Sequence, residues 1–257
     1  NSRVLRENKQ VMASEDRDLR ALYETLAELP PGRVYAGLQN NWGGDYLVGS
    51  VPVYALLIAE GMDMLSFYPH GHSLNSAGLV LFDEKRWEHY NIYNIRYVVA
   101  PEGRTLPGFA SPIRKFGRHR LYQVETTGYF DLVGSGLEFA GGRTDFYPAA
   151  TAWLASELPR TKQHPTMLLG RPAIKDERSF TGKVESSAGP SRGTVLSEGI
   201  GSNFFTANVT VERDSLLMLK ATYHPNWRAT VGGIKTDTVM LMPSFVGVQL
   251  PPGDHEV

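Results

Sequence analysis

Short β-type segments recur through the last third of the chain, and this repetition constrains the fold more than any other feature. Each segment is rich in apolar, β-branched or aromatic residues, and polar or turn-forming residues separate it from the next. In chain order the segments are FFTANVTVE, SLLMLKATY, WRATVGG, TDTVMLMP and FVGVQLPPG. Strands that repeat about every eight to twelve residues are typical of antiparallel sandwiches. We therefore predict a β-sandwich domain over residues 166–257.

The N-terminal part mixes helical and strand patterns, which predicts an α/β domain over residues 1–125. Ser14 followed by Glu15, Asp16 and Asp18 has the composition of a helix start, because a hydroxyl can cap the first turn and acids favour the positive end of the helix dipole. RVYAGL and IRYVVAP predict strands, and IRKFGRHRLYQVE predicts a hairpin. VPVYALLIAEGM and FDEKRWEHYNIYN predict two further helices.

Residues 126–165 differ in character and predict a connector that carries one helix. GSGLEFAGGRTD is rich in turn formers. TDFYPAATAWLASELP has helical composition, with Thr144 or Asp145 as its cap. Pro148 must then lie in the first turn, where its missing N–H is tolerated. The whole chain is therefore predicted to be α+β, with an α/β part followed by the sandwich.

Composition excludes several classes of protein. The chain has 257 residues, of which 42% are hydrophobic and 21% are charged, and this balance is ordinary for a globular domain. A formal net charge of -1 gives no electrostatic case for binding nucleic acid. The lack of cysteine removes disulfides, thiolate metal ligands and a cysteine nucleophile. No apolar run reaches the roughly 18 residues that a membrane span needs.

The C-terminal segment YHPNWRATVGGIKTDTVMLMPSFVGVQLPPGDHEV combines a Pro-x-Trp corner, a strand ending in a Gly-Gly hairpin, and a Pro-x-Gly-x-His turn. The positions that carry this pattern are Leu216–Leu219, Pro225, Trp227, Val231–Gly233 and Pro252–His255. The pattern resembles the extracytoplasmic region of large bacterial polytopic membrane proteins of the YfhO-like kind, which are related to GT-C glycosyltransferases. YNIYNIRYVVAP followed by RKFGRHRLYQVETTGYF is a second, weaker resemblance to this family.

The resemblance implies an accessory domain on the periplasmic or extracellular face of the cell membrane. In this family the chemistry is attributed to acidic residues beside membrane helices. The chain is therefore expected not to be catalytic by itself and to need no cofactor, while the full-length protein is a candidate glycosyltransferase. The expected ligand is a glycan or a polyprenyl-linked sugar, which a sandwich of jelly-roll or carbohydrate-binding-module type would suit.

Attachment to the membrane is expected through flanking segments outside this sequence. The return strand that begins after PPG in VQLPPGDHEV stops within a few residues, whereas a hairpin strand normally continues for about five or six. This favours a piece of a longer polypeptide.

Two loops, LQNNWGGDYLVGS and SFYPHGHSLNS, hold the richest mixture of aromatic and polar residues. Aromatic rings can pack on sugar faces and polar groups can bond hydroxyls, which is the mixture a binding pocket needs. The candidate glycan-binding residues are Trp42, Asp45, Tyr46, Tyr68, His70, His72 and Asn75. Two ordinary turn-rich loops are the competing interpretation. The spacing of His70 and His72 suits a metal, but the sequence identifies no third ligand, so no metal site is predicted.

The stretch YHPNWRATVGG fits either a structural corner or a ligand contact. Four residues have the alternation of one strand face, which we expect to face the core: Tyr223, Trp227, Ala229 and Val231. Pro225 suits a kink at the strand entry, and the indole N–H of Trp227 needs a partner. His224 suits a hydrogen-bonding corner. We predict a structural corner formed by His224, Pro225 and Trp227.

Two other functions stay open from the sequence. A soluble, glycan-active hydrolase or transferase would need paired carboxylates, or Ser, His and Asp within reach of each other. Asp83, Glu84, Glu88 and His89 fall on a predicted helix, where such residues usually form the solvated face. A purely structural or assembly domain would bind no ligand at all.

Overall fold

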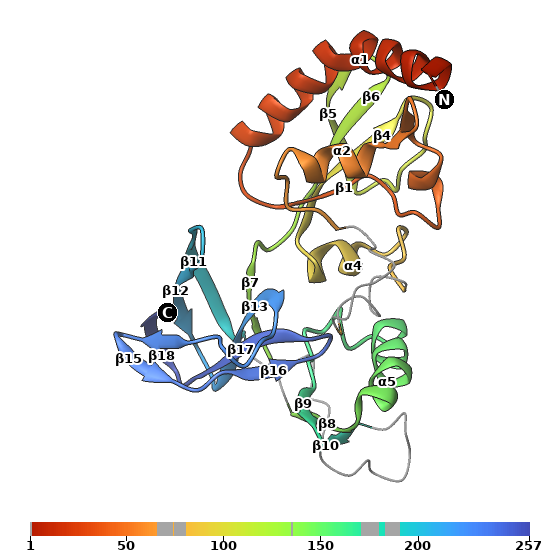
Figure 1. Ribbon diagram of the computed structural model, residues 1–257. Helices are drawn as coiled ribbons and strands as arrows, with labels where there is room; N and C mark the ends of the chain where they lie inside the picture. Colours follow the sequence, from red (N-terminus) through yellow and green to blue (C-terminus); the bar gives the residue numbers. More distant parts are fainter. Residues whose placement is uncertain (1, 66–73, 75–80, 135, 171–179, 183–190) are drawn as a thin grey trace. The chain divides into compact units, whose positions relative to one another are not determined.

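The computed structural model describes residues 2–65, 74, 81–134, 136–170, 180–182 and 191–257 (Figure 1). The chain divides into two compact units. Unit 1 contains Asn1–Pro69 and Glu84–Thr126, and unit 2 contains His70–Asp83 and Thr127–Val257. Helices and strands occur in both units, and the C-terminal region is rich in strands. The predicted α+β class is confirmed.

Unit 1 is built on a four-stranded sheet with the order β1-β4-β6-β5. β1 and β4 are parallel, and the other neighbours are antiparallel. The elements of this unit are α1 (Ser2–Glu28), β1 (Arg33–Tyr35), η1 (Trp42–Gly44), β2 (Leu47–Val48), β3 (Val51–Pro52), α2 (Val53–Ala59), α4 (Trp87–Ile92), β4 (Ile95–Pro101), β5 (Ala110–Phe116) and β6 (His119–Val124). The predicted strands and the hairpin are confirmed, and the two later helices are shorter than predicted.

Helix α1 starts well before the predicted position. Ser14 lies inside the helix, and its hydroxyl donates to the carbonyl oxygen of Val11 at 2.7 Å, so the predicted cap at Ser14 is wrong. The preceding segment contains neither Gly nor Pro, so nothing in its backbone stops a helix. The apolar face of α1 packs into the core of unit 1, which includes Leu19, Leu22, Leu26, Val34, Val99 and Leu121.

Unit 2 contains a seven-stranded sheet with the order β10-β8-β9-β16-β17-β13-β7 and a three-stranded sheet with the order β11-β12-β18. β8 and β9 are parallel and are connected through α5, whereas the other pairs of both sheets are antiparallel. The elements are β7 (Phe130–Val133), β8 (Leu137–Gly141), α5 (Arg143–Ala155), β9 (Thr166–Leu169), β10 (Thr181–Gly182), β11 (Gly193–Ile200), β12 (Phe205–Val211), β13 (Ser215–Thr222), β14 (Ala229–Val231), β15 (Ile234–Thr236), β16 (Val239–Leu241), β17 (Phe245–Leu250) and β18 (Gly253–Glu256).

The three-stranded sheet packs on one face of the seven-stranded sheet, so the predicted sandwich is confirmed. The buried residues between the sheets alternate along their strands, as residues on one face of a strand must. They include Phe130 and Leu132 of β7, Ala207, Val209 and Val211 of β12, Leu217 and Leu219 of β13, and Val246, Val248 and Leu250 of β17.

The strand after PPG does not form the predicted hairpin. β18 pairs with β12 of the three-stranded sheet and not with β17, which precedes it. Pro251 and Pro252 lack the N–H that a strand pair would need, so the chain passes here from one sheet to the other.

The predicted connector, residues 126–165, supplies both β7 and β8 to the seven-stranded sheet. GSGLEFAGGRTD, predicted as turns, contains β8. Helix α5 begins at Arg143, and the carboxylate of Asp145 accepts the N–H of Gly142 at 2.6 Å. Pro148 therefore lies in the second turn of α5, and the prediction of a first-turn position is wrong.

Candidate functional site

Three of the predicted glycan-binding residues, Trp42, Asp45 and Tyr46, lie close together around η1 in unit 1. Asp45 is exposed, and its backbone N–H donates to the carbonyl oxygen of Trp42 at 3.3 Å. The other four, Tyr68, His70, His72 and Asn75, lie outside the described residues.

Trp42 and Tyr46 make internal contacts. The guanidinium of Arg104 lies 4.3 Å from the centre of the Trp42 ring and covers one of its faces. Tyr46 is only 2% exposed, and its hydroxyl is hydrogen-bonded to Nδ1 of His119. A ring must be accessible to pack on a sugar, so these contacts suit a structural role for both residues. Their glycan-binding role stays a prediction.

Glu84 is the centre of a polar cluster that the sequence did not indicate. Its Oε1 atom accepts from the Tyr35 hydroxyl at 2.5 Å, the Trp42 indole at 2.5 Å and the Asn41 amide at 3.1 Å. Its Oε2 atom accepts from Arg104 at 2.7 Å. The prediction of a solvated helix face is wrong for Glu84, because α4 begins only at Trp87. Four donors satisfy this carboxylate, which indicates that it organises the loop.

His119 of β6 lies between the carboxylate of Glu15 and the hydroxyl of Tyr46 and is hydrogen-bonded to both. Its Nε2–H donates to Glu15 at 2.8 Å, and its Nδ1 atom accepts from Tyr46. Burial lowers the pKa of His119, although Glu15 raises it, so the imidazole is neutral near pH 7. This order resembles a nucleophilic triad. The Tyr46 hydroxyl is buried and burial also raises its pKa, so the chain of bonds fastens α1 to the sheet and is not a nucleophilic site.

The stretch around Trp227 in unit 2 forms a tight turn between β13 and β14. The Trp227 indole N–H donates to the carbonyl oxygen of Thr222 at 3.0 Å. The backbone N–H of Trp227 donates to the carbonyl oxygen of His224, also at 3.0 Å. Nδ1 of His224 accepts the N–H of Asn226 at 3.1 Å. The residues predicted to face the core pack against the sandwich, although the turn interrupts the strand. They are Tyr223, Trp227, Ala229 and Val231.

Two adjoining hollows, of about 390 and 260 Å³, lie at this turn and share Phe204, Phe205, Trp227 and Arg228. Phe204 is 56% exposed. The larger hollow is also lined by polar side chains, which are Asn203, His224 and Asn226. We call the two hollows, with all the residues that line them, the corner pocket. The sequence contained one indication of it. Two aromatics in succession cannot both face one core from a strand, so one of Phe204 and Phe205 had to point elsewhere.

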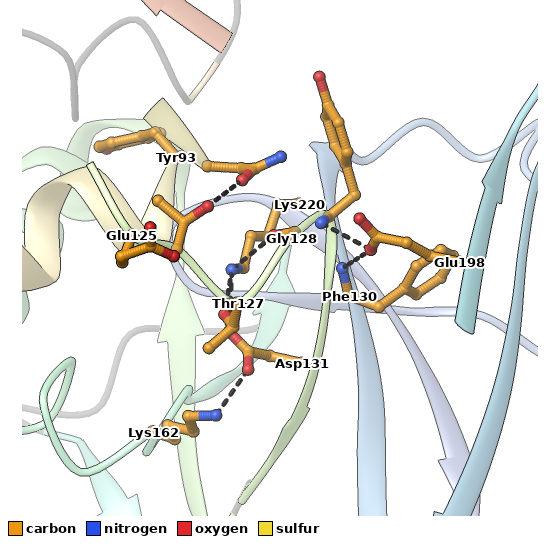
Figure 2. Close-up of polar contacts among 12 residues, drawn as sticks. Tyr93, Glu125, Thr127, Gly128, Phe130, Asp131, Lys162, Glu198 and Lys220 are labelled. Atoms are coloured by element: carbon orange, nitrogen blue, oxygen red, sulfur yellow. Dashed lines mark hydrogen bonds and ion pairs between the residues drawn. The ribbon is translucent and has the colours of Figure 1, made fainter. Parts of the chain in front are cut away.

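A second site of unit 2 surrounds Asp131 on β7, the edge strand of the seven-stranded sheet (Figure 2). Lys220 is fully buried, and its ammonium lies 2.9 Å from Asp131 and donates at 2.8 Å to both Thr127 and Gly128. Lys162 approaches the other carboxylate oxygen of Asp131 at 2.6 Å. Burial alone would raise the pKa of Asp131, but the two ammonium groups hold it at about 2.

A cleft of about 680 Å³ opens beside Asp131. Its lining comes from β7, the segment 160–163, the start of β11 and the turn before β13. The cationic residues of this lining are Arg160, Lys162, Arg192 and Arg213. We call it the basic cleft. The sequence contained a clue here too, since Lys220 interrupts the apolar run SLLMLKATY, and a buried charge needs a partner.

Comparison with known proteins assigns the chain to no class. No family model matches it, and no curated protein or solved structure is significantly similar. Within the part of the chain that the structure describes, no helix is both long and apolar enough to cross a membrane. The same described residues contain no group of three or more His, Cys, Asp or Glu side chains placed to hold a metal ion.

Proposed function

We propose that the chain is a non-catalytic, extracytoplasmic binding domain of a multi-span membrane protein, and that it holds a glycan or a lipid-linked sugar in the corner pocket. The observation that carries the proposal is an exposed aromatic ring, Phe204, in a hollow that also contains amide and imidazole side chains. The sequence resemblance to the YfhO-like family supports the membrane context and the relation to glycosyltransferases.

The chemistry of the corner pocket suits a sugar. An aromatic ring buries the apolar C–H face of a pyranose, and a few placed polar groups bond its hydroxyls. Phe204 provides the accessible ring, while Asn203 and Asn226 bring amides that can both donate and accept. Arg228 Nη1 donates to the carbonyl oxygens of Pro225 and Trp227, each at 2.9 Å, so its guanidinium is held as part of the wall.

The lining favours binding over hydrolysis. Among the described residues that form the corner pocket there is no Asp or Glu side chain. Glycoside hydrolysis commonly uses two carboxylates that flank the scissile bond. A catalytic role would therefore require groups from outside this pocket.

The test is a calorimetric titration of the purified chain with neutral oligosaccharides and with a polyprenyl-phosphate-linked sugar in detergent. Phe204→Ala should weaken binding about tenfold, which corresponds to roughly 1.4 kcal/mol of lost ring contact. Leu196→Ala on β11 is a matched control, because Leu196 is 64% exposed and does not line the pocket. Equal affinities for the two variants, or no binding by the wild type, would reject the proposal.

The membrane context needs its own experiment. An antibody against the chain should detect, in detergent-extracted membranes of the source cells, a polypeptide much larger than the chain itself. A soluble band of the size of the chain would contradict this part of the proposal. Release of sugar from a glycoside panel by the chain alone would favour the soluble-enzyme alternative.

A further inference from the structure

We infer that the ligand of the corner pocket is an amphiphile, a sugar that carries a hydrocarbon chain, and that this chain enters the sandwich through the smaller of the two hollows. The inference rests on the proposed function, because it specifies which class of ligand the corner pocket binds. We call the hollow of about 390 Å³ the outer hollow and the hollow of about 260 Å³ the inner hollow.

The inner hollow lies between the two sheets of the sandwich. Leu217, Leu219 and Val248 line it from the seven-stranded sheet, and Thr206 lines it from the three-stranded sheet. The three apolar residues belong to the sandwich core and are at most 7% exposed. Protein interiors rarely contain spaces larger than a water molecule, and such spaces weaken the packing around them. A hollow of this size in the core therefore has room for part of a ligand.

The lining of the inner hollow is mainly apolar. Most of the described residues that line it without lining the outer hollow have hydrocarbon side chains, and the others are threonines. The hydrocarbon side chains are those of Phe130, Leu217, Leu219, Ala229, Val246, Val248 and Val257. An apolar cavity of about 150 Å³ is known to stay dry and to bind benzene. The inner hollow is larger, so its size and its lining suit a hydrocarbon chain.

Aromatic rings join the two hollows. Phe204, Phe205 and Trp227 are part of both linings, and the ring centres of Phe205 and Trp227 lie 6.1 Å apart. The Trp227 indole N–H already donates to the carbonyl oxygen of Thr222, so its ring offers the hollows an apolar surface. Arg228 is the fourth shared residue, and its Nη1 atom donates to two backbone carbonyl oxygens. A ligand can therefore pass from one hollow into the other along apolar surface.

The polar groups lie at the outer hollow. Asn203, His224 and Asn226 are exposed and line the outer hollow but not the inner one. Nδ1 of His224 accepts the N–H of Asn226, so a neutral imidazole carries its proton on Nε2 and can donate it to a ligand. A polar mouth that continues into an apolar interior matches a molecule with a polar head and a hydrocarbon chain. A free glycan would leave the inner hollow unfilled.

The experiment is a calorimetric titration of the purified chain with methyl, butyl and hexyl β-glucoside, which share one head and stay monomeric in water, and with hexanol. The affinity should rise about fourfold for each added methylene, the effect of burying that group. The heat-capacity change on binding should become more negative along the series, because more apolar surface is buried. Asn203→Ala changes the outer hollow alone and should weaken the three glucosides by the same factor.

Ala229→Leu fills part of the inner hollow. It should remove most of the gain in affinity from methyl to hexyl glucoside and leave the affinity for methyl glucoside unchanged. Ala221→Leu is the matched control, because Ala221 is also a partly buried residue of the same core and lines neither hollow. If Ala229→Leu does not fold, Thr238→Leu provides the same test, since Thr238 lines the inner hollow and is only partly buried.

The inference fails if methyl and hexyl glucoside bind equally, or if Ala229→Leu keeps the full gain in affinity. Equal binding that Asn203→Ala still weakens would overturn the inference and leave the proposed glycan site intact. Binding of hexanol without binding of methyl glucoside would support the hydrocarbon site and reject the sugar site, and a complete absence of binding would reject both. Dimerisation that Phe204→Ala abolishes, without binding of hexyl glucoside, would show that a second copy of the chain occupies the pocket and would overturn the inference.

Discussion

The ammonium of Lys220 lies 2.9 Å from the carboxylate of Asp131, and the two residues belong to the neighbouring strands β13 and β7. Phe130 and Leu217, which alternate with them, face the sandwich core, so the ion pair lies on the opposite face of the same sheet. Both side chains are nearly inaccessible to solvent. A pair of this kind is worth little compared with apolar packing, but it is costly to break.

We predict that Lys220→Met destabilises unit 2 by about 3–5 kcal/mol, because Asp131 then remains buried with the Thr127 hydroxyl and the partly exposed Lys162 as its partners. The double variant Lys220→Met/Asp131→Leu should lose less stability than the two single variants together, since it leaves no buried charge. Urea unfolding followed by fluorescence measures the free energy of unfolding of the two single variants and of the double variant. Additive losses would mean that the pair is not energetically coupled.

We predict an acid-side loss of stability from His164. Burial lowers its pKa from the ordinary value of 6.5 to about 4, and its Nδ1–H donates to the carbonyl oxygen of Met242 at 2.7 Å. Because the folded state disfavours the protonated ring, the stabilising contribution is complete above pH 6.5 and is lost as the pH falls towards 4. Between these two pH values the free energy of unfolding falls by about 1.4 kcal/mol for each pH unit.

His164→Asn keeps an N–H donor and removes the titration, so its stability should change less than that of the wild type between pH 6.5 and 4.

Asp131 affects stability in a separate, lower pH range. Its folded pKa of about 2 lies below the ordinary 3.8, so its contribution is present above pH 3.8 and is lost as the pH falls through 2. Identical pH profiles for His164→Asn and the wild type would contradict the assignment to His164.

We predict that Gly128→Ala is destabilising. Gly128 has φ +87°, and a Cβ there would lie 2.4 Å from a carboxylate oxygen of Glu198. The change would displace the acceptor of two N–H groups at the start of β7. Gly232→Ala is the control, since Gly232 also has a positive φ of +56° but no atom within 4 Å of its Cβ position.

The control should show only the conformational cost of an alanine in this region, about 1–2 kcal/mol, and Gly128→Ala should exceed it. Thermal unfolding of both variants measures the difference. Equal losses would show that the contact with Glu198 has no energetic weight.

In unit 1, we predict that Glu84→Ala lowers stability by about 2–3 kcal/mol and shifts the fluorescence of Trp42. The variant removes the shared acceptor of four donors. Tyr35 ends β1, Asn41 and Trp42 belong to the loop that follows, and Arg104 lies beyond β4. Glu102→Ala is the control. Glu102 forms salt bridges with Lys115 and Arg120, but its side chain is 52% exposed, so its loss should have little effect. A Glu84→Ala variant that matches the control would show that the cluster does not stabilise the loop.

The sequence was informative where local patterns decide the structure. Alternation in FFTANVTVE and SLLMLKATY places Val209 and Leu217 in the sandwich core, and the turn residues between the segments separate the strands. It was less informative where a contact joins distant residues. Glu84 meets Tyr35 and Trp42 across more than 40 positions, and no local pattern reports such a contact.

Element ends and sites were harder to predict for related reasons. The start of α1 was misplaced because acids after Ser14 look like a cap, although the backbone before it is equally able to be helical. The basic cleft gathers Arg160, Arg192 and Arg213 from separate segments, so their proximity depends on the tertiary fold. Lys220 and the pair Phe204–Phe205 were the two local anomalies that pointed towards the sites.

The position of Lys220 within β13 also restricts how that strand can pair. If β13 slipped by one residue against β7, every side chain of β13 would change face, and the ammonium would enter the sandwich core beside Leu132 and Val248. A slip by two residues would keep the face. In one direction it would move Lys220 away from Asp131, and in the other it would put Lys220 opposite Asp131, where Met218 lies in the structure. A strand as apolar as SLLMLKATY would otherwise tolerate several alignments. The lysine therefore acts as a register mark, which disfavours any alignment of β13 and β7 that is shifted by one residue.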